Sequence, residues 1–303
     1  MWLFAELTRR GAGGRSSSSG IRACVFGPNG FMGRYVINQL GRTGTQIVAP
    51  YRCEEMRIRH LRPAGDLGQV TPLAFDPYEY DSIMSMMEHC NVVVNLTGKR
   101  YETAHWNFQD AHVHLPEAIA MAAAESGIET MIHMSAMGAD VDSPSEWFAS
   151  KARGETAVLN ALPSATILRP GPIVGPEDYY MRFFNGLTKI MPGPLAGYLP
   201  LMDGGLNVQQ PVLACDVADA VVGAINTVGT EGQTYELGGP TTYTIEELAE
   251  VYFDSVKYPE HGRPTMSVPK MVRTRRNHRH SFIPGGISDR LFVVTVCNDD
   301  GWQ

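Results

Sequence analysis

The sequence predicts an α/β protein built on a Rossmann-type, doubly wound parallel sheet, with a smaller C-terminal lobe. Three observations predict this fold. Apolar runs of strand length alternate with helical patterns from Ile21 to about residue 175, as in a chain of βαβ units. A glycine-rich turn, Gly27–Gly33, separates the first expected strand from the first helix. The run Val92–Leu96 is apolar enough to be buried on both faces, as strands of parallel sheets are.

The elements follow in a regular order along the chain. Strands are expected at residues 22–26, 46–49, 70–75, 92–96, 130–134 and 165–168. After the first strand, apolar residues recur at helical spacing until Gly41 ends the helix; they are Met32, Val36, Ile37 and Leu40. Further helices are expected near 80–89 and over 118–125, where strong helix formers accumulate.

Two further helices carry N-terminal signals of their own. Ser143 and Glu146 have the spacing of a capping box, with Pro144 at the first helical position, so a helix is expected to begin there. Thr244 and Glu247 form a second capping box, which predicts a helix beginning at that threonine.

The composition is that of an ordinary soluble globular protein, with 44% hydrophobic and 19% charged residues in 303. The net charge of −7 gives no general attraction to nucleic acid. No stretch approaches the roughly 20 apolar residues that cross a bilayer, so membrane association would go through partners. The cysteines are scattered without a C-x-x-C pair, which indicates free thiols in a reducing compartment rather than disulfides or zinc; they are Cys24, Cys53, Cys90, Cys215 and Cys297.

The two ends of the chain differ from its middle in composition. Residues 263–303 carry a net charge of +4, including the basic run 273–280, while the remainder carries −11. This tail is interpreted either as solvated chain or as a contact for acidic protein surface or anionic lipid. Residues 1–22 are rich in Arg and Ser and poor in acids, which is typical of an organelle transit peptide; a flexible glycine-serine arm is the alternative.

The turn after the first strand predicts a dinucleotide site. Gly27, Gly30 and Gly33 have the spacing G-x-x-G-x-x-G between a strand and a helix. Such glycines allow a tight turn, a close approach of the backbone to a pyrophosphate, and close packing of helix on strand. The helix N-terminus then offers unpaired N–H groups to the anion.

The tip of the second strand favours NADP(H) over NAD(H). NAD sites place an Asp or Glu there for the ribose 2′-hydroxyl, whereas this chain has Arg52. A guanidinium neutralises a 2′-phosphate and bonds it with two N–H groups. Arg34, just after the third glycine, either assists or faces solvent.

Two further strand ends are expected near the cofactor. Asp76, after the third strand, either bonds the adenine amino group or caps the next helix. Leu96, Thr97 and Gly98 end the fourth strand, and the glycine and small polar threonine suit a close approach of the backbone to the cofactor's ribose and phosphates. His112 and His114 are two residues apart, so they face different sides of a helix and make a poor metal pair.

This arrangement resembles the extended, atypical branch of the short-chain dehydrogenase/reductase superfamily. In that family a Tyr is the general acid/base, a Lys four residues later lowers its pKa and holds the nicotinamide ribose, and a Ser lies upstream. Lys151 matches the family lysine and Ser135 the serine, but Trp147 stands at the tyrosine position. An indole N–H only donates and does not titrate, so it cannot transfer the proton that accompanies a hydride.

The resemblance therefore implies a cofactor site without proton chemistry. The expected cofactor-binding residues are Gly27, Asn29, Gly30, Phe31, Met32, Gly33, Arg52, Asp76, Leu96, Thr97, Gly98, Ser135, Lys151 and Pro170. No catalytic residue and no metal ligand is expected. Two other functions stay open: a free-standing NADPH-dependent reductase or isomerase using Tyr179, Tyr180 or Lys151, and a module that senses the NADPH/NADP⁺ ratio.

Longer strings resemble a narrower family, the NAD(P)-binding accessory subunits of mitochondrial respiratory complex I (NADH:ubiquinone oxidoreductase) in their plant and algal form. The strings include Gly30–Tyr35, Pro50–Arg52, Gly65–Val70, Asn91–Leu96, Tyr101–Thr103 and Tyr235–Pro240. The resemblance covers about residues 10–255 and fades after Lys257, whereas family members continue well beyond this length.

This family resemblance implies a structural NADPH and a role in the assembly and stability of the complex. It implies a peripheral position on the matrix side of the mitochondrial inner membrane, near the junction of the matrix and membrane arms. The implied partners are other complex I subunits, with phospholipid contact at the membrane surface. We therefore expect an N-terminal arm (1–19), an NAD(P)-binding Rossmann domain (20–175), a smaller C-terminal lobe (176–260) and a basic, divergent tail (261–303).

Overall fold

The computed structural model describes residues 16–190, 198–255 and 265–268, and the chain divides into two compact units. The first unit runs to Asp178 and resumes over Gln210–Pro240; the second comprises Tyr179–Gln209 and the chain from Thr241. The first boundary lies close to the expected one at residue 175. The expected lobe 176–260, however, loses its middle to the first unit, because residues 210–240 supply that unit with a strand and a helix.

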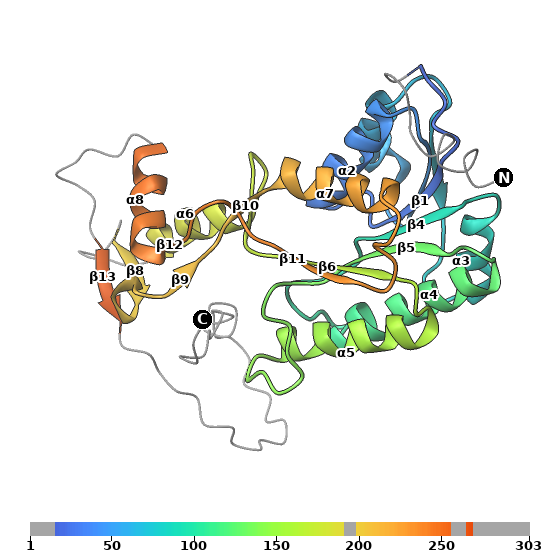
Figure 1. Ribbon diagram of the computed structural model, residues 1–303. Coiled ribbons are helices and arrows are strands. Elements are labelled where there is room, and N and C mark those ends of the chain that lie inside the picture. The colour runs from blue at the N-terminus through green and yellow to red at the C-terminus, as the bar shows by residue number, and fades with distance from the viewer. Residues whose placement is uncertain (1–15, 191–197, 256–264, 269–303) are drawn as a thin grey trace. The chain divides into compact units, whose positions relative to one another are not determined.

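The first unit is centred on a seven-stranded parallel sheet (Figure 1). Its strand order is β11-β6-β5-β4-β1-β2-β3, the order of a doubly wound nucleotide-binding sheet extended by one strand. The strands are β1 (Arg22–Phe26), β2 (Gln46–Tyr51), β3 (Val70–Ala74), β4 (Val92–Asn95), β5 (Thr130–Met134), β6 (Thr166–Pro170) and β11 (Thr234–Leu237). Every neighbouring pair of these strands is parallel.

Six of these strands lie where the sequence predicts them, within two residues at each end. The seventh, β11, was not predicted, because its short run is exposed and carries no apolar alternation. It joins the sheet by pairing with β6, where Tyr235 lies opposite Leu168, and Glu236 forms an ion pair with Arg169 of β6.

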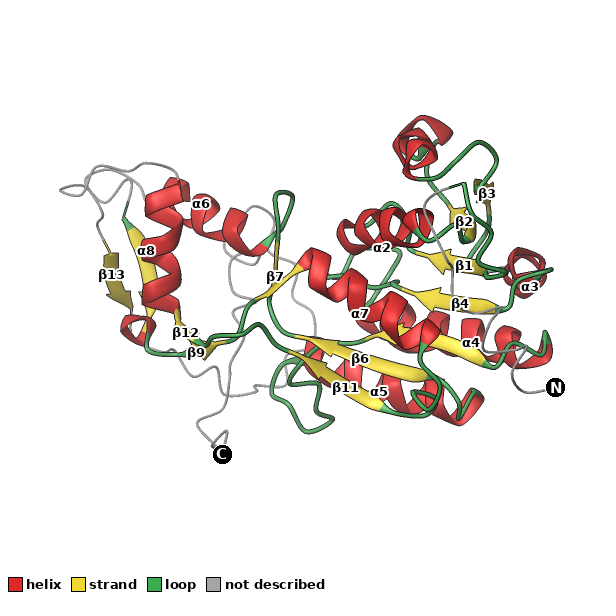
Figure 2. Ribbon diagram, turned by 45° about the horizontal axis from the view of Figure 1, so that its top comes forward, coloured by secondary structure: helices red, strands yellow, loops and turns green. Residues whose placement is uncertain are grey.

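Helices cover both faces of the sheet, as a doubly wound fold requires (Figure 2). One face carries α2 (Phe31–Arg42) and α7 (Ala214–Asn226). The other carries α3 (Tyr80–Met87), α4 (Leu115–Glu125) and α5 (Glu146–Ala161). Short helical turns complete the connections over 55–57, 59–64 and 110–114.

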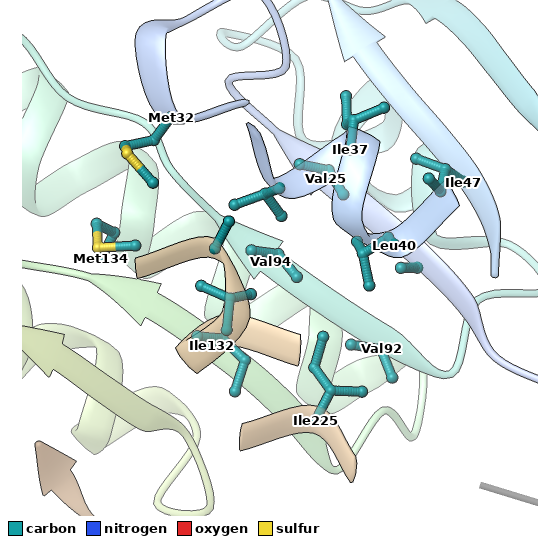
Figure 3. Close-up of a cluster of buried hydrophobic side chains, with 14 of the residues drawn as sticks. Val25, Met32, Ile37, Leu40, Ile47, Val92, Val94, Ile132, Met134 and Ile225 are labelled. Carbon is teal, nitrogen blue, oxygen red and sulfur yellow. The ribbon is translucent and has the colours of Figure 1, made fainter. Parts of the chain in front are cut away.

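The alternation of β1 divides its side chains between two cores. Val25 packs on the α2 side with residues such as Ile37, Val94 and Ile225 (Figure 3). Phe26 points to the opposite face and packs in a cluster with Ile119, Met131 and Ile167. β1 is thus buried on both faces, and its C-terminal end is held rigidly where the glycine-rich turn begins.

The two predicted capping boxes have different outcomes. The second is confirmed: the Glu247 backbone N–H donates to Thr244 Oγ1 at 3.2 Å, the Thr244 N–H donates to Glu247 Oε2 at 2.8 Å, and α8 spans Ile245–Ser255. The first does not form, because Ser143 Oγ instead accepts the N–H of Ser145, and α5 begins at Glu146, two residues later than the box predicts.

The second unit has a small core of its own. α6 (Tyr180–Ile190) and α8 pack around buried Phe184, Leu201, Tyr252 and Phe253. Its strand pairs are β8 (Leu199–Met202) with β13 (Thr265–Val268), and β9 (Val208–Gln209) with β12 (Tyr243–Thr244). In the first unit, β7 (Ile173–Val174) pairs with β10 (Val212–Leu213).

The expected N-terminal arm up to residue 15 and the basic run 273–280 lie outside the described residues. Within the described ranges, no helix combines the length and apolar character needed to span a bilayer.

Candidate functional site

The glycine-rich turn joins β1 to α2 at the carboxyl edge of the sheet. Gly27 adopts a φ of +81°, a backbone conformation that side chains disfavour. A Cβ on Gly33 would lie 2.5 Å from the Gly27 carbonyl oxygen and would also strike Pro28, so the helix can approach the strand this closely only with glycine there. No side chain caps α2 at Gly30, which leaves its first-turn N–H groups for an anion.

A cavity of about 300 Å³ opens beside this turn. Its lining residues are Gly27, Pro28, Asn29, Gly30, Pro50, Tyr51, Arg52, Cys53, Phe75, Pro77, Leu96, Thr97, Gly98, Lys99, Trp106, Ala111 and Leu115. Two of these residues are cations and none is a carboxylate. The cavity is therefore electrostatically suited to an anionic ligand that also presents flat apolar surface.

Arg52, after the tip of β2, lies over the indole ring of Trp106 at 5.0 Å from the ring centroid. Trp106 is nearly buried, and the ring of Tyr78 lies 5.2 Å from it. A cation over an aromatic face is held in place without a carboxylate to neutralise it. The charge of Arg52 thus remains directed at the cavity it lines.

Lys99 is the second cation of the cavity. Its ammonium donates to Thr103 Oγ1 at 3.3 Å. Partial burial and the nearby charge of Arg52 lower the pKa of Lys99. The two side chains are thus close enough to repel one another when no anion lies between them.

The end of β4 is ordered by buried Asn95. Its Oδ1 accepts the backbone N–H of Thr97 at 3.0 Å and the Thr97 hydroxyl at 2.6 Å. Its Nδ2 donates to Nδ1 of His133 on β5 at 3.1 Å. These bonds set the direction in which the chain leaves the sheet toward Gly98.

Lys151 lies on α5 and is almost fully buried. Its ammonium donates to the carbonyl oxygen of Met134, at the end of β5, at 3.2 Å. Burial lowers the pKa of Lys151 to about 8, although the charge of Glu155 acts in the opposite direction. A Cβ on Gly98 would lie 3.2 Å from Lys151 Nζ, so the ammonium lies directly behind the cavity loop.

Two buried polar atoms near this lysine have no hydrogen-bond partner among the described residues. They are the hydroxyl oxygen of Ser135, which follows Met134, and Nε2 of His133. Burial and the charge of Lys151 lower the pKa of His133 to about 3, so its ring is neutral at physiological pH. A buried hydroxyl without a partner is costly unless a ligand or water pairs with it.

Trp147 lies four residues before Lys151 on α5. Its indole Nε1 donates to the backbone carbonyl oxygen of Lys99 at 2.8 Å. His112 contacts the indole edge to face, with ring centroids 6.1 Å apart. The indole therefore supports the loop after β4 and is not among the cavity's lining residues.

The structure separates the predicted cofactor residues into two groups. Lining the cavity are Gly27, Asn29, Gly30, Arg52, Leu96, Thr97 and Gly98. Outside the lining lie Phe31, Met32, Gly33, Asp76, Ser135, Lys151 and Pro170. In this second group Asp76 Oδ1 accepts the N–H of Tyr78, and the Pro170 carbonyl accepts the N–H of Met137, both at 2.9 Å.

Of the lining residues that sequence reasoning missed, Lys99 and Trp106 bear most directly on the charge of the cavity, since Lys99 is its second cation and Trp106 lies under Arg52. Both belong to the irregular segment between β4 and α4, where no hydrophobic period marks a side chain as inward-facing. The alternative catalytic candidates Tyr179 and Tyr180 belong to the second unit, with Tyr180 at the first position of α6. Among the described residues no group of three or more His, Cys, Asp or Glu side chains could hold a metal ion.

Comparison with known proteins gives consistent family matches. A sequence model of the NAD dependent epimerase/dehydratase family matches residues 23–238. A protein named NADH dehydrogenase [ubiquinone] 1 alpha subcomplex subunit 9, mitochondrial, from Arabidopsis thaliana is 44% identical over 97% of this chain and 73% of its own length. The mouse protein of that name is 42% identical over 83% of this chain, but the match spans only 65% of its own length. The NADH-ubiquinone oxidoreductase 40 kDa subunit of Neurospora crassa is 38% identical over 87% of this chain and 67% of its own.

Solved structures share the fold at much lower identity. UDP-glucuronic acid 4-epimerase from Bacillus cereus, in complex with NAD, has a TM-score of 0.67 at 16% identity and covers 82% of this chain and 88% of its own. dTDP-glucose 4,6-dehydratase from Bacillus anthracis, also with NAD, has a TM-score of 0.65 at 16% identity over 83% of this chain and 85% of its own. These likenesses show the fold.

Proposed function

The chain belongs to the NAD dependent epimerase/dehydratase family and to the alpha subcomplex subunit 9 proteins of NADH dehydrogenase [ubiquinone], and from this membership we propose that it holds NADPH as a structural element of that enzyme. Its relatives are named as mitochondrial subunits. In this proposal the chain is an accessory subunit that binds the nucleotide without turning it over.

The charge of the cavity supports NADPH rather than NADH. Arg52 occupies the strand tip where NAD sites place an acid, and no carboxylate lines the cavity. The glycine-rich turn and the open start of α2 are suited to the pyrophosphate. Trp106 and Phe75 supply flat apolar surface for the adenine.

The buried polar groups behind the cavity loop fit the nicotinamide half. In this proposal Lys151, whose ammonium now donates to the Met134 carbonyl, bonds the ribose hydroxyls, and the unpartnered hydroxyl of Ser135 bonds the nicotinamide side. When bound, a nicotinamide supplies hydride chemistry, which needs a proton donor beside the substrate. In this proposal Trp147 stands where the family has its proton donor, and the observation that carries the proposal is that the indole commits its single N–H to the carbonyl oxygen of Lys99.

The position within the assembly is also a proposal. We place the chain on the matrix side of the inner membrane, against other subunits of the enzyme, where it supports assembly and stability. Phospholipid contact at the membrane surface would complement the net positive charge of residues 263–303. The chain spans 73% of its Arabidopsis relative and 65% of its mouse relative. Its association with the other subunits of the enzyme is therefore part of the same proposal.

The test is native purification of the tagged full chain from the organism that makes it. We expect co-purification with NADH dehydrogenase, release of an equimolar amount of NADPH on denaturation, and no NADPH oxidation by the isolated chain. Arg52→Met should abolish retention of NADPH. Arg34→Met is the matched control, because Arg34 pairs with Glu177 and does not line the cavity.

Three results would contradict the proposal. The first is that the chain migrates alone under native conditions. The second is that it releases NAD(H) in place of NADPH, and the third is that the isolated chain oxidises NADPH in a steady state. The first result excludes the subunit role, the second the 2′-phosphate site, and the third the structural role of the cofactor.

A further inference from the structure

The peptide unit of Lys99 is held at both of its polar groups. Its carbonyl oxygen accepts the indole N–H of Trp147 at 2.8 Å, and its N–H donates to His112 Nε2 at 3.0 Å. Loop backbone is normally the most mobile part of a ligand site. Here two side chains from helical segments fix one loop residue between them.

These contacts close into a ring of hydrogen bonds. Burial and the charge of Lys151 lower the pKa of His112 to about 3, so its ring carries a single proton at physiological pH. His112 Nε2 lies 2.9 Å from the Lys99 carbonyl oxygen as well as 3.0 Å from the Lys99 N–H, and we assign the proton to Nδ1 because only this tautomer gives the Lys99 N–H an acceptor. His112 then donates to Ser150 Oγ at 2.8 Å, and the Ser150 hydroxyl donates to the Trp147 carbonyl at 2.8 Å. The ring thus runs from Trp147 through Lys99, His112 and Ser150 back to Trp147, with every donor paired.

The ring holds the backbone of a residue whose side chain is a cation. Lys99 and Arg52 line the same cavity, and burial together with the charge of Arg52 lowers the pKa of the lysine. Neither has a carboxylate partner among the lining residues. Holding two like charges together is unfavourable unless a polyanion lies between them, and a phosphate monoester carries about −1.5 to −2 charges near neutral pH.

We propose that Lys99 joins Arg52 in binding the 2′-phosphate of the nucleotide, and that Trp147 is the positioning residue that fixes Lys99 for this role. This inference rests on the proposed NADPH site. The single replacement at position 147 then has two effects: it removes the proton donor, and it adds a clamp on the loop that grips the cofactor.

The experiment measures discrimination between two fragments that differ only in the 2′-phosphate. The full chain, freed of nucleotide, is titrated with adenosine 2′,5′-bisphosphate and with AMP. Lys99→Met should reduce the preference for the bisphosphate about tenfold, the loss expected for one charge-assisted hydrogen bond. Arg100→Met is the matched control, since this neighbouring cation does not line the cavity and should leave the preference unchanged.

The clamp is tested by a double-mutant cycle. Trp147→Phe keeps an aromatic ring but removes the N–H, and it should lower the preference about threefold to tenfold in the parent chain. In the Lys99→Met background the same change should have no further effect on the preference. Phe148→Leu, which disturbs an aromatic neighbour of the indole, is its control. If Trp147→Phe does not fold, Ser150→Ala opens the same ring at another point and should behave alike.

The outcomes separate this inference from the proposed function. If the parent chain does not prefer the bisphosphate, the NADPH site itself fails. If the parent chain prefers it and Arg52→Met removes the preference while Lys99→Met does not, NADPH binding stands and the role of Lys99 is overturned. Full additivity of Trp147→Phe with Lys99→Met would overturn the positioning role of the indole.

Discussion

The indole nitrogen of Trp147 and the carbonyl oxygen of Lys99 lie 2.8 Å apart, which ties helix α5 to the loop after β4. In the short-chain dehydrogenase pattern this helix position holds an ionisable phenol that faces the substrate. Here it holds a group that only donates and whose proton is committed to the backbone. In the structure this side chain supports the loop after β4.

Replacing Trp147 by the tyrosine of the short-chain dehydrogenase pattern should lower the stability of the protein and confer no activity. A tyrosine hydroxyl extends from the end of its ring, whereas the indole donates from its edge, so Trp147→Tyr leaves the Lys99 carbonyl without this partner. We expect a loss of about 1–2 kcal/mol in the free energy of unfolding, the usual effect of one broken hydrogen bond with its packing. Urea unfolding of parent and variant measures it. Unchanged stability together with new NADPH oxidation would instead identify a decayed active site.

Lys151 is predicted to destabilise the protein in the absence of cofactor. Its pKa in the folded state is about 8, below the ordinary value of 10.5, because burial disfavours the charge. Between these two pH values the unfolded chain binds the proton more readily, so the free energy of unfolding should rise with pH, by up to about 1.4 kcal/mol per pH unit. Lys151→Met should remove this rise and stabilise the nucleotide-free chain at pH 7.

The same substitution should abolish retention of the cofactor, so stability and binding move in opposite directions. Urea midpoints at pH 7 and pH 9, with nucleotide content, measure both. Arg153→Met is a suitable control on the same helix, because Arg153 pairs with Glu146 and its side chain is partly exposed. A parallel loss of stability and binding in Lys151→Met would show that the lysine is a structural member of the fold.

The strands were predictable because their signals are local. The β1 run, the glycine spacing and the tip residue Arg52 are contiguous in sequence, and so is the capping box of Thr244 and Glu247. Ser143 shows the limit of such a pattern. Its hydroxyl accepts the Ser145 N–H within a turn, which competes with capping a helix.

The places of Trp106 and Lys99 in the cavity could not be predicted, because they depend on contacts between segments far apart in the sequence. Trp106 lies under Arg52, and Lys99 lies between His112 and Trp147, across separations of up to about 50 residues that no local pattern encodes. β11 is a further example, since it joins the sheet from beyond the second unit's first segment. Only the folded topology brings these residues together.

Acid should destabilise the chain through its two buried histidines. The pKa of His112 and that of His133 are each lowered to about 3, first by burial and then by the charge of Lys151. As pH falls from the ordinary value of 6.5 toward 3, the unfolded chain takes up protons that the folded chain does not. The free energy of unfolding should therefore fall by up to about 1.4 kcal/mol per pH unit for each histidine.

His133→Asn separates this effect from general acid unfolding. The side-chain oxygen of an asparagine at position 133 can accept the hydrogen bond that Asn95 Nδ2 now donates to His133 Nδ1. Folding is then retained while one titrating group is removed. The slope of stability against pH between 6 and 4 should become shallower than in the parent. His89→Asn is the control, because it makes the same replacement at an exposed histidine. Equal slopes in His133→Asn and the parent would refute the assignment.

Close packing of α2 on the glycine-rich turn predicts opposite effects for two glycine substitutions. In Gly33→Ala the new Cβ would lie 2.5 Å from the Gly27 carbonyl oxygen, where only backbone atoms could move to relieve it. We expect loss of cofactor retention and destabilisation of about 1–3 kcal/mol, as for overpacking of a tight core.

Gly223 lies within α7, and a Cβ there would meet no atom within 4 Å. Gly223→Ala should therefore stabilise the chain by about 0.5–1 kcal/mol, the helix preference of alanine over glycine, and leave the cofactor bound. Thermal unfolding and nucleotide content of the two variants decide the matter: if Gly33→Ala retained the cofactor as well as Gly223→Ala, the turn would not need its close approach to the helix.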